Sequence, residues 1–177
     1  MVSVRVAHTA DLDAATLTAA RRLLDEVFAP DMADEDWEHC LGGLHTLVWD
    51  GPELVGHAAL VQRRLLHGGR ALRTGYVEGV AVRADRRRSG VGAAMMDHLA
   101  RVARAAYDLA ALGSSDTAGP FYTACGWQPW RGRTFALTPD GIRRTPDEDG
   151  GIHVLPLAAP LDLGGDLVAD WRDGDVW

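Results

Sequence analysis

The chain has 177 residues, of which 47% are hydrophobic, and it carries a formal net charge of −7 at pH 7. This length and composition predict one domain with a substantial core, covering residues 1–177. The negative charge argues against a nucleic-acid partner. No run of about 18 apolar residues is present, and the N-terminal segment lacks a basic region followed by an apolar one. We therefore expect no membrane association and a cytoplasmic location.

The two cysteines, Cys40 and Cys125, are too few to suggest a disulfide framework, and we expect both to be reduced and close to the core. No cluster of Cys and His has the spacing of metal ligands. The sequence therefore predicts no metal.

The first 50 residues predict short elements in alternation. Apolar residues alternate before residue 8, and either Asp11 or Asp13 can cap the helix that follows, which Pro30 ends. Gly42 and Gly43 close a second short helix. The expected elements are a strand at 3–8, a helix to about residue 28, a helix at 34–41 and a strand at 44–49.

The middle of the chain predicts an antiparallel meander that leads into a helix. A long strand at 54–66, a turn at Gly68-Gly69 and a returning strand at 70–83 form a hairpin. The helix at 91–106 then crosses over to a parallel strand at 109–113. Further on, we expect a short helix at 119–125, a strand at 127–137, a final strand at 152–157 and a tail. The pattern indicates an α/β fold with a mixed sheet.

The most informative segment is 76–98, in which an apolar strand leads into an arginine- and glycine-rich turn, at 84–92, and then into a helix. The turn contains three arginines, Arg86, Arg87 and Arg88, and two glycines, Gly90 and Gly92. Glycines let backbone amides approach an anion, and the start of a helix adds the positive end of its dipole. The segment suits a pyrophosphate, although a solvated connection has the same composition.

Two common nucleotide motifs do not fit this turn. A P-loop requires a lysine, and all 18 basic residues of the chain are arginine. A dinucleotide-binding fingerprint requires a third glycine at the position that Met95 occupies.

The segment Arg87-Arg88-Ser89-Gly90-Val91-Gly92 resembles the acetyl-coenzyme A signature of the GNAT acyltransferases, Arg/Gln-x-x-Gly-x-Gly/Ala. Other segments, in order along nearly the whole chain, resemble one branch of that family, the aminoglycoside 2'-N-acetyltransferases. These are HTADLD at 8–13, DWEH at 36–39, LGG at 41–43, GYVEGVAVRAD at 75–85, GW at 126–127, TPD at 145–147 and DWRDGDVW at 170–177.

The resemblance implies a GNAT-type acyl-CoA N-acyltransferase fold, with a mixed, mostly antiparallel sheet flanked by helices. It also implies that acetyl-CoA is the cosubstrate and that an acetyl group is transferred directly to the 2'-amine of an aminoglycoside. The cofactor would then contact the strand through Val80, Ala81 and Val82, and its phosphates would contact Arg87, Arg88, Ser89, Gly90, Val91 and Gly92. Which arginine of 86–88 contacts the phosphates is open.

Acetyl transfer to an amine requires a base, a polarised carbonyl and an acid. Glu78 interrupts an apolar strand, and Gly79 after it indicates a bulge that would expose the amides of Val80 and Val82. From the residues alone, Glu78 is equally a carboxylate on the exposed face of an edge strand. The resemblance makes Glu78 the base, acting through a water if the amine is out of reach. It makes Tyr122 the acid, although an aromatic residue there is also typical of a core.

The acceptor implied by the resemblance is a polycation, which acidic residues attract. Asp31, Glu78, Gly79, Glu148, Asp175 and Trp177 match its contacts. Glu148 stands where relatives have aspartate. For most acidic residues taken individually, simple solvation is the favoured interpretation, and the tail could fray. Trp171 and Trp177 favour a tail that folds back.

Two other functions fit the same residues. One is a GNAT acetyltransferase for another cationic amine, and the other is a non-catalytic acetyl-CoA sensor. Because GNAT relatives often pair, a homodimer is a further expectation. Cys125 is not expected to act as a nucleophile, because no histidine partner is evident near it in the sequence.

Overall fold

The computed structural model describes residues 2–115 and 117–177. The chain divides into two compact units. Unit 1 consists of Met1–Val61 and Val77–Leu99, and unit 2 consists of Gln62–Tyr76 and Ala100–Trp177. Two long strands and one helix run through both units. They are β3 (Glu53–His67), β4 (Arg70–Val82) and α3 (Val91–Ala106).

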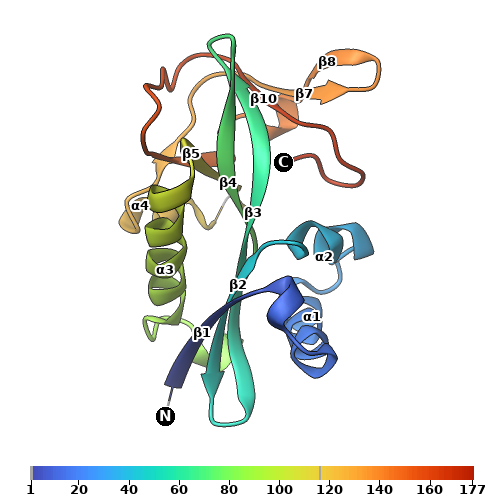
Figure 1. Cartoon of the computed structure of the whole chain (residues 1–177), viewed down its shortest axis with the longest axis vertical. Helices are drawn as coiled ribbons and strands as arrows, with labels where there is room; N and C mark the ends of the chain where they lie inside the picture. The colour runs from blue at the N-terminus through green and yellow to red at the C-terminus, as the bar shows by residue number, and fades with distance from the viewer. Residues whose placement is uncertain (1, 116) are drawn as a thin grey trace. The chain divides into compact units, whose positions relative to one another are not determined.

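Unit 1 is built on a short antiparallel sheet. Its further elements are β1 (Val2–His8), α1 (Ala14–Phe28), α2 (Asp34–Cys40) and β2 (Leu44–Asp50). Strand β2 pairs with β1 on one side and with β3 on the other, both in antiparallel register. In unit 1, α1 and α2 lie on one side of β2 and β3, and α3 lies on the other (Figure 1). These elements confirm the prediction for the first 50 residues.

Helix α1 begins where its sequence dictates. The carboxylate of Asp13 accepts a hydrogen bond of 2.7 Å from the Thr16 amide, so Asp13, and not Asp11, is the cap. Ala20, Leu23 and Leu24 are buried along one face of the helix, at the spacing of a helical stripe. They pack in a core cluster with Leu12, Cys40, Leu47, Leu54, Ala59 and Ala81.

Helix α3 packs closely on the other face of the unit 1 sheet because Gly56 has no side chain. A Cβ added at Gly56 would lie 2.8 Å from a methyl group of Val91 and 3.0 Å from the sulfur of Met95. The glycine therefore fixes how near the first turn of α3 lies to β3, and with it the end of the arginine-rich turn.

Unit 2 holds the rest of the sheet, in the order β6-β9-β5-β4-β3-β10-β7-β8. Its own elements are β5 (Leu109–Gly113), α4 (Gly119–Ala124), β6 (Gln128–Pro129), β7 (Thr134–Thr138), β8 (Gly141–Arg144), β9 (Ile152–Pro156) and β10 (Leu167–Ala169). The β4–β5 and β7–β10 pairs are parallel, whereas β5–β9, β6–β9, β7–β8 and β3–β10 are antiparallel. The sheet is therefore mixed and mostly antiparallel, as predicted.

The prediction of one strand at 127–137 was wrong. The segment forms two strands, because β6 pairs with β9 while β7 pairs with β8 and β10. Between the two strands the polypeptide contacts a loop that is distant in the sequence: the amides of Arg131 and Gly132 donate to the Leu163 carbonyl at 2.9 and 3.0 Å. A Cβ on Gly132 would collide with the Gly165 carbonyl. This contact is long-range, so local alternation of apolar residues could not reveal it.

The strand at 152–157 was also predicted to be the last, and the structure corrects this. It is β9, and β10 follows it in the tail, between β3 and β7. Strand β8 was likewise missed, because its four residues are all exposed and carry no apolar alternation. Among the described residues, no helix is both long and apolar enough to cross a membrane.

Candidate functional site

The arginines of the turn at 84–92 have different environments. Arg86 forms ion pairs with Asp50 at 2.9 Å and with Asp85 at 2.7 Å, and is therefore held against the protein. The Arg87 Nε donates to the Val82 carbonyl at 3.2 Å. Arg88 is exposed and adopts a left-handed backbone conformation, with φ +58°. Arg87 and Arg88 are thus the arginines whose side chains lie outermost.

Helix α3 begins immediately after this turn. Gly90, with φ +88°, turns the chain into the helix, and its carbonyl accepts the helical hydrogen bond from Ala94 at 3.0 Å. The amides at the start of an α-helix have no partner inside it and point along the axis, where they attract anions. The geometry of the turn and the charge of its arginines fit a pyrophosphate group.

Strand β4 contains the expected irregularity at Gly79, with φ +56°. A Cβ there would lie 2.8 Å from the sulfur of Cys40, so the position requires glycine twice, for conformation and for space. The ladder between β4 and β5 covers Thr74–Tyr76. Glu78, just before the bulge, is half-buried, and β4 lies between β3 and β5 in the strand order. Although β4 as a whole is an inner strand, Glu78 lies beyond the residues of β4 that pair with β5.

A buried chain of hydrogen bonds, which was not predicted from the sequence, ends at this bulge. The His57 Nδ1 lies 2.8 Å from the Gly79 carbonyl oxygen, and the His57 Nε2 lies 3.0 Å from the His45 Nδ1. The His45 Nε2 in turn lies 2.8 Å from the Thr9 hydroxyl. Both rings are fully buried, and burial lowers the pKa of each to about 4.

The register explains how the two histidines meet. Strands β2 and β3 pair Leu47 with His57 and His45 with Ala59, so the histidines are diagonal neighbours on one face of the sheet. In the sequence, His45 and His57 each interrupt an apolar strand, which indicates a polar contact in the core. Only the register shows that they contact each other.

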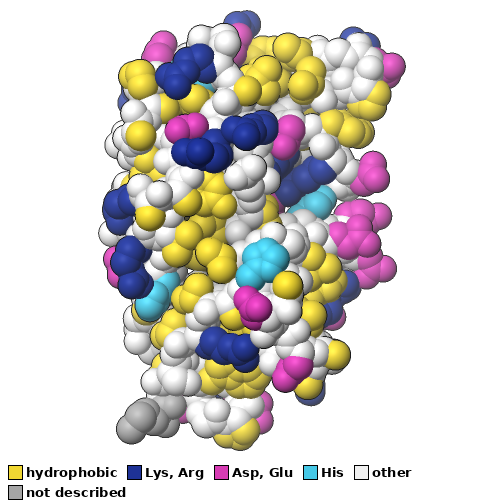
Figure 2. All heavy atoms as spheres, viewed as in Figure 1, with side chains coloured by type: hydrophobic (Ala, Val, Ile, Leu, Met, Phe, Trp, Pro, Cys, Tyr) yellow, Lys and Arg dark blue, Asp and Glu magenta, His cyan; other side chains and the backbone are white. Residues whose placement is uncertain are grey.

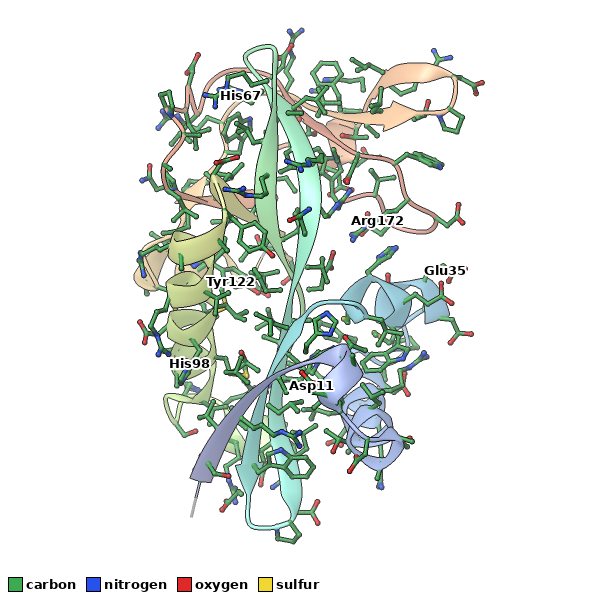
Figure 3. The ribbon with its side chains drawn as sticks, in the orientation of Figure 1. Asp11, Glu35, His67, His98, Tyr122 and Arg172 are labelled. Carbon is green, nitrogen blue, oxygen red and sulfur yellow. The ribbon has the colours of Figure 1, made fainter. Side chains whose placement is uncertain are left out.

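Tyr122 lies on α4 in unit 2 (Figure 3) and is 7% exposed. Burial, with a smaller contribution from Cys125, raises its pKa to about 12. Its ring centroid is 6.0 Å from that of His153, whose Nδ1 lies 3.1 Å from the Ser114 hydroxyl. The phenol is therefore protonated at neutral pH, as an acid must be.

Three of the acidic residues around α2 have local contacts. Arg21 pairs with Asp25 at 2.7 Å and with Asp34 at 2.9 Å, and Asp36 accepts from the Ala33 amide. Figure 2 shows acidic side chains gathered over α2, and Figure 3 shows Glu35 pointing outward from it. Asp31 follows α1 and is exposed.

The C-terminal segment at 170–177 folds back onto unit 2, as expected. Buried Arg63 of β3 donates to the Asp170 carboxylate at 2.7 Å, to the Asp170 carbonyl at 2.8 Å and to the Val176 carbonyl at 2.7 Å. Arg172, labelled in Figure 3, donates to the carbonyls of Asp175 and Trp177 at 2.8 and 3.0 Å. The segment is held mainly by arginine donors that bind its backbone.

Three of the predicted acceptor residues come together in unit 2. The Trp177 amide donates to the Asp175 carboxylate, and the indole NH of Trp177 donates to the Thr145 hydroxyl, both at 3.0 Å. Burial raises the pKa of Glu148, and the nearby charge of Asp175 raises it further. Trp177 is 5% exposed, so most of its ring packs against the protein.

The neighbouring Asp149 has the opposite environment. It pairs with Arg144 and accepts from the amide and hydroxyl of Thr134, and the Arg144 hydrogen bond contributes most to lowering its pKa to about 2. Asp149 is therefore a charged carboxylate that stabilises the fold through Arg144, whereas Glu148 is a carboxylate with another negative charge close by.

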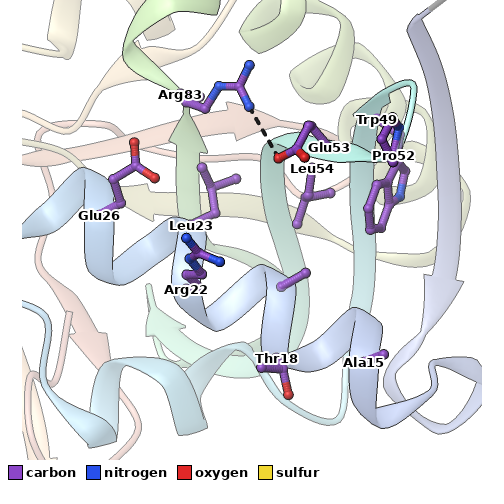
Figure 4. Close-up of a pocket in the computed structure, with 11 residues that line it drawn as sticks. Ala15, Thr18, Arg22, Leu23, Glu26, Trp49, Pro52, Glu53, Leu54 and Arg83 are labelled. Carbon is purple, nitrogen blue, oxygen red and sulfur yellow. Dashed lines mark ion pairs between the residues drawn. The ribbon is translucent and has the colours of Figure 1, made fainter.

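The predicted residues are divided between the two units. Unit 1 contains Asp31, Glu78, Gly79, Val80, Ala81, Val82 and the segment 87–92, and unit 2 contains Tyr122, Glu148, Asp175 and Trp177. A hollow of about 340 Å³ in unit 1, between α1 and the β2–β3 hairpin, is lined by none of them (Figure 4). Its rim is occupied by Arg83, which pairs with Glu53 at 3.8 Å and Asp85 at 2.7 Å.

Within the described part of the chain there is neither a disulfide nor a cluster of potential metal ligands. Neither Cys40 nor Cys125 is in a disulfide. Residues 2–115 and 117–177 contain no group of three or more His, Cys, Asp or Glu side chains that could hold a metal ion.

Comparison with known proteins places this geometry in a family. Residues 8–130 match the family described as acetyltransferase (GNAT) domain. Over 179 aligned residues, the chain is 50% identical to the aminoglycoside 2'-N-acetyltransferase of Mycolicibacterium fortuitum, covering 99% of this chain and 92% of that protein.

Solved structures share the fold at lower identity. Escherichia coli ElaA matches with a TM-score of 0.61 and 20% identity, over 87% of this chain and 99% of that one. The ribosomal-protein-S18-alanine N-acetyltransferase of Escherichia coli matches with a TM-score of 0.61 and 19% identity, over 92% and 97%. The chain belongs to the GNAT acetyltransferase family, in the branch of the aminoglycoside 2'-N-acetyltransferases.

Proposed function

We propose that this protein is an aminoglycoside 2'-N-acetyltransferase that works as one domain over residues 1–177. It transfers the acetyl group of acetyl-CoA to the 2'-amine of the drug, which would make the cell that contains the enzyme resistant to that drug. The observation that carries the proposal is 50% identity to an enzyme of that name over 99% of this chain.

In this proposal acetyl-CoA binds along β4 and at the turn that follows. The amides of Val80 and Val82 receive the thioester and the pantetheine arm, with Ala81 between them. The pyrophosphate is bound by backbone amides of 87–92 and by the outward side chains of Arg87 and Arg88. The exposure of both arginines supports this assignment, and the ion pairs of Arg86 with Asp50 and Asp85 argue against a phosphate role for it.

Glu78 is the proposed base. The attacking amine must lose a proton as its nitrogen forms a bond to the acetyl carbon, and the Glu78 carboxylate takes that proton directly or through a water. Its half-buried position next to the Gly79 bulge supports this role, because the residue lies beside the amides proposed to bind the thioester.

Tyr122 is the proposed acid. When the carbon–sulfur bond breaks, the electron pair goes to sulfur, and the Tyr122 hydroxyl gives its proton to the coenzyme A thiolate. A phenol with a pKa of about 12 remains protonated throughout the neutral range and is available for this step.

The acceptor is proposed to bind through Asp31, Glu78, Gly79, Glu148, Asp175 and Trp177. A polycationic sugar is attracted by a site that gathers several carboxylates. Burial is the main cause of the raised pKa of Glu148, and the charges of Asp175 and Asp147 add to it, so negative charge is concentrated around this carboxylate. A bound ammonium group would relieve that repulsion.

The regiochemistry can be tested with two aminoglycosides that differ only in an amine or a hydroxyl at the 2' position. Purified protein and acetyl-CoA should release coenzyme A thiol with the amine and not with the hydroxyl. Equal rates with both drugs would contradict the 2' assignment. Acetylation of polyamines but of neither drug would indicate a GNAT enzyme for another cationic amine.

Catalysis can be separated from mere cofactor binding with the Tyr122→Phe and Glu78→Gln variants. We expect kcat to fall by roughly 10²- to 10⁴-fold in each, with acetyl-CoA affinity nearly unchanged. A parent protein that binds acetyl-CoA but turns over no acceptor would instead be a sensor. The proposal also includes a cytoplasmic homodimer, which sedimentation of the purified protein and cell fractionation would check.

A further inference from the structure

The buried histidines His45 and His57 have a directional hydrogen-bond pattern that follows from its two ends. A carbonyl oxygen can only accept, so the His57 Nδ1, 2.8 Å from the Gly79 oxygen, must carry the hydrogen. In a neutral ring the Nε2 of His57 is then an acceptor, and it must receive the Nδ1–H of His45 at 3.0 Å. Both rings are therefore Nδ1–H tautomers.

The same logic continues to Thr9. The Nε2 of His45 is left as an acceptor, so the Thr9 hydroxyl donates to it at 2.8 Å. That hydroxyl in turn accepts the Gly42 amide at 2.9 Å. The Thr9 hydroxyl also lies 3.2 Å from the Gly43 carbonyl, but that carbonyl already accepts the Thr9 amide at 3.0 Å, so the hydroxyl hydrogen can go to His45 and one set of hydrogen positions satisfies this hydrogen-bond chain. The lowered pKa of both histidines, caused mainly by burial, keeps the rings neutral near pH 7.

This hydrogen-bond chain orients the peptide group between Gly79 and Val80. The Gly79 carbonyl and the Val80 amide belong to one planar trans peptide, so they point in opposite directions. Fixing the carbonyl toward His57 therefore fixes the direction of the Val80 N–H. Strand parity gives the same answer independently. The Arg83 amide donates to Val55 of β3 at 2.9 Å, and successive amides alternate between the two edges, so Val82 and Val80 point away from β3.

We propose that His57, aligned by His45 and Thr9, is a positioning residue that aims the Val80 amide at the thioester carbonyl of acetyl-CoA. This inference rests on the proposed function, in which that amide polarises the carbonyl. Amide donors of this kind act only when they are already directed at the developing negative charge. A flexible glycine at position 79 could not hold that direction alone, and the histidine chain supplies the missing restraint.

Two variants separate the hydrogen bond from the shape of the ring. His57→Phe keeps a ring but removes the donor to Gly79, and His57→Asn loses the ring but keeps an N–H where the Nδ1–H stood. We expect kcat to fall about 10- to 100-fold in His57→Phe, less than the roughly 10²- to 10³-fold that removing such a donor entirely costs. His57→Asn should recover a substantial part of the loss, and the KM for the aminoglycoside should stay within about twofold in both.

A matched control is Thr46→Val. Thr46 is adjacent to His45 and is also buried, but its hydroxyl has no hydrogen-bond partner within the described structure. Removing that hydroxyl should leave kcat unchanged. If His57→Phe does not fold, Thr9→Val is the alternative variant. It removes only the hydroxyl at the far end of the hydrogen-bond chain and should lower kcat about two- to fivefold.

A second measurement does not depend on turnover. Nitrogen-15 NMR of the parent protein should show Nδ1–H tautomers for both His45 and His57, which tests the hydrogen-bond directions on which the inference depends. Titration calorimetry should show weaker acetyl-CoA binding in His57→Phe, with coenzyme A binding unchanged. Because these two measurements need no acceptor, they still test the inference if the aminoglycoside assignment fails.

The inference would be overturned by an Nε2–H tautomer at His57. It would also be overturned by a folded His57→Phe variant that keeps the kcat of the parent, or by a His57→Asn variant no better than His57→Phe.

Discussion

The β4–α3 segment at 77–92 and the C-terminal segment at 170–177 are organised in opposite ways. The first is shaped mainly by its own backbone, through the positive φ of Gly79, Arg88 and Gly90, and has one distant restraint, the hydrogen bond from His57 to the Gly79 carbonyl. The second is held from a distance: Arg63 contacts a residue 107 positions away in the sequence. A binding segment made by local conformation is specified by a short motif, whereas a segment held by distant donors depends on the whole fold. Substitutions in the two should therefore affect different steps.

The largest effect should come from Gly79→Ala in the local segment. The new Cβ would lie 2.8 Å from the Cys40 sulfur, and the alanine would have to adopt a φ of +56°, so we expect the bulge to be lost. We expect kcat to fall by about 10²-fold, the cost of losing one directed amide. Steady-state kinetics with varied acetyl-CoA will measure it. Gly69→Ala is the control: its φ is +75° but nothing lies within 4 Å of the added Cβ, so its activity should be retained.

A smaller effect should follow from Arg63→Met in the distant clamp. The buried guanidinium is 5% exposed and Asp170 is 37% exposed. We therefore expect the free energy of unfolding to fall by about 2–3 kcal/mol, less than for a fully buried pair. Because the tail loosens, the KM for the aminoglycoside should rise roughly tenfold with the KM for acetyl-CoA little changed.

The control for the clamp is Arg133→Met, which breaks an exposed pair with Asp166 and should cost under about 1 kcal/mol. Denaturant unfolding and substrate kinetics test both variants. Equal changes in the KM of both substrates in Arg63→Met would remove the distinction between the two segments.

The smallest effect should come from Glu148→Gln. Burial and Asp175 raise the pKa of Glu148 in the folded protein, so folding favours its protonated form and stability from this group increases as pH falls through that pKa. In its proposed role Glu148 binds the drug in its charged form, so aminoglycoside affinity should increase as pH rises through the same range. In the variant this part of the pH dependence should vanish, and affinity above that range should fall about threefold, as calorimetry at several pH values would show.

Local pattern was enough to predict most of unit 1. The Asp13 cap, the hairpin glycines at 68–69 and the helix at 91–106 each follow from short-range signals, and α3 has the predicted bounds. Failures occurred where pairing is distant. The chain breaks between β6 and β7 because the loop around Leu163 packs there, and β10 joins the sheet through β3 and β7.

The candidate site divides in the same way. Glu78 and Gly79 are visible because a carboxylate and a glycine interrupt an apolar strand, and the turn at 84–92 is visible from its composition. His45 and His57 could not be assigned a role, because it depends on which residues the β2–β3 register makes diagonal neighbours. Arg63 was missed for a similar reason, since nothing near it in the sequence indicates that it binds Asp170.

The left-handed backbone of Arg88 has a consequence for laboratory evolution. A non-glycine residue in that conformation costs of the order of 1 kcal/mol, so Arg88→Gly should raise the melting temperature. A selection for heat resistance alone would therefore favour glycine here and should yield a sturdier protein with weaker acetyl-CoA affinity. Measuring both quantities in that one variant would show whether the arginine is retained for binding at the expense of stability, and an unchanged acetyl-CoA affinity would show that it is not.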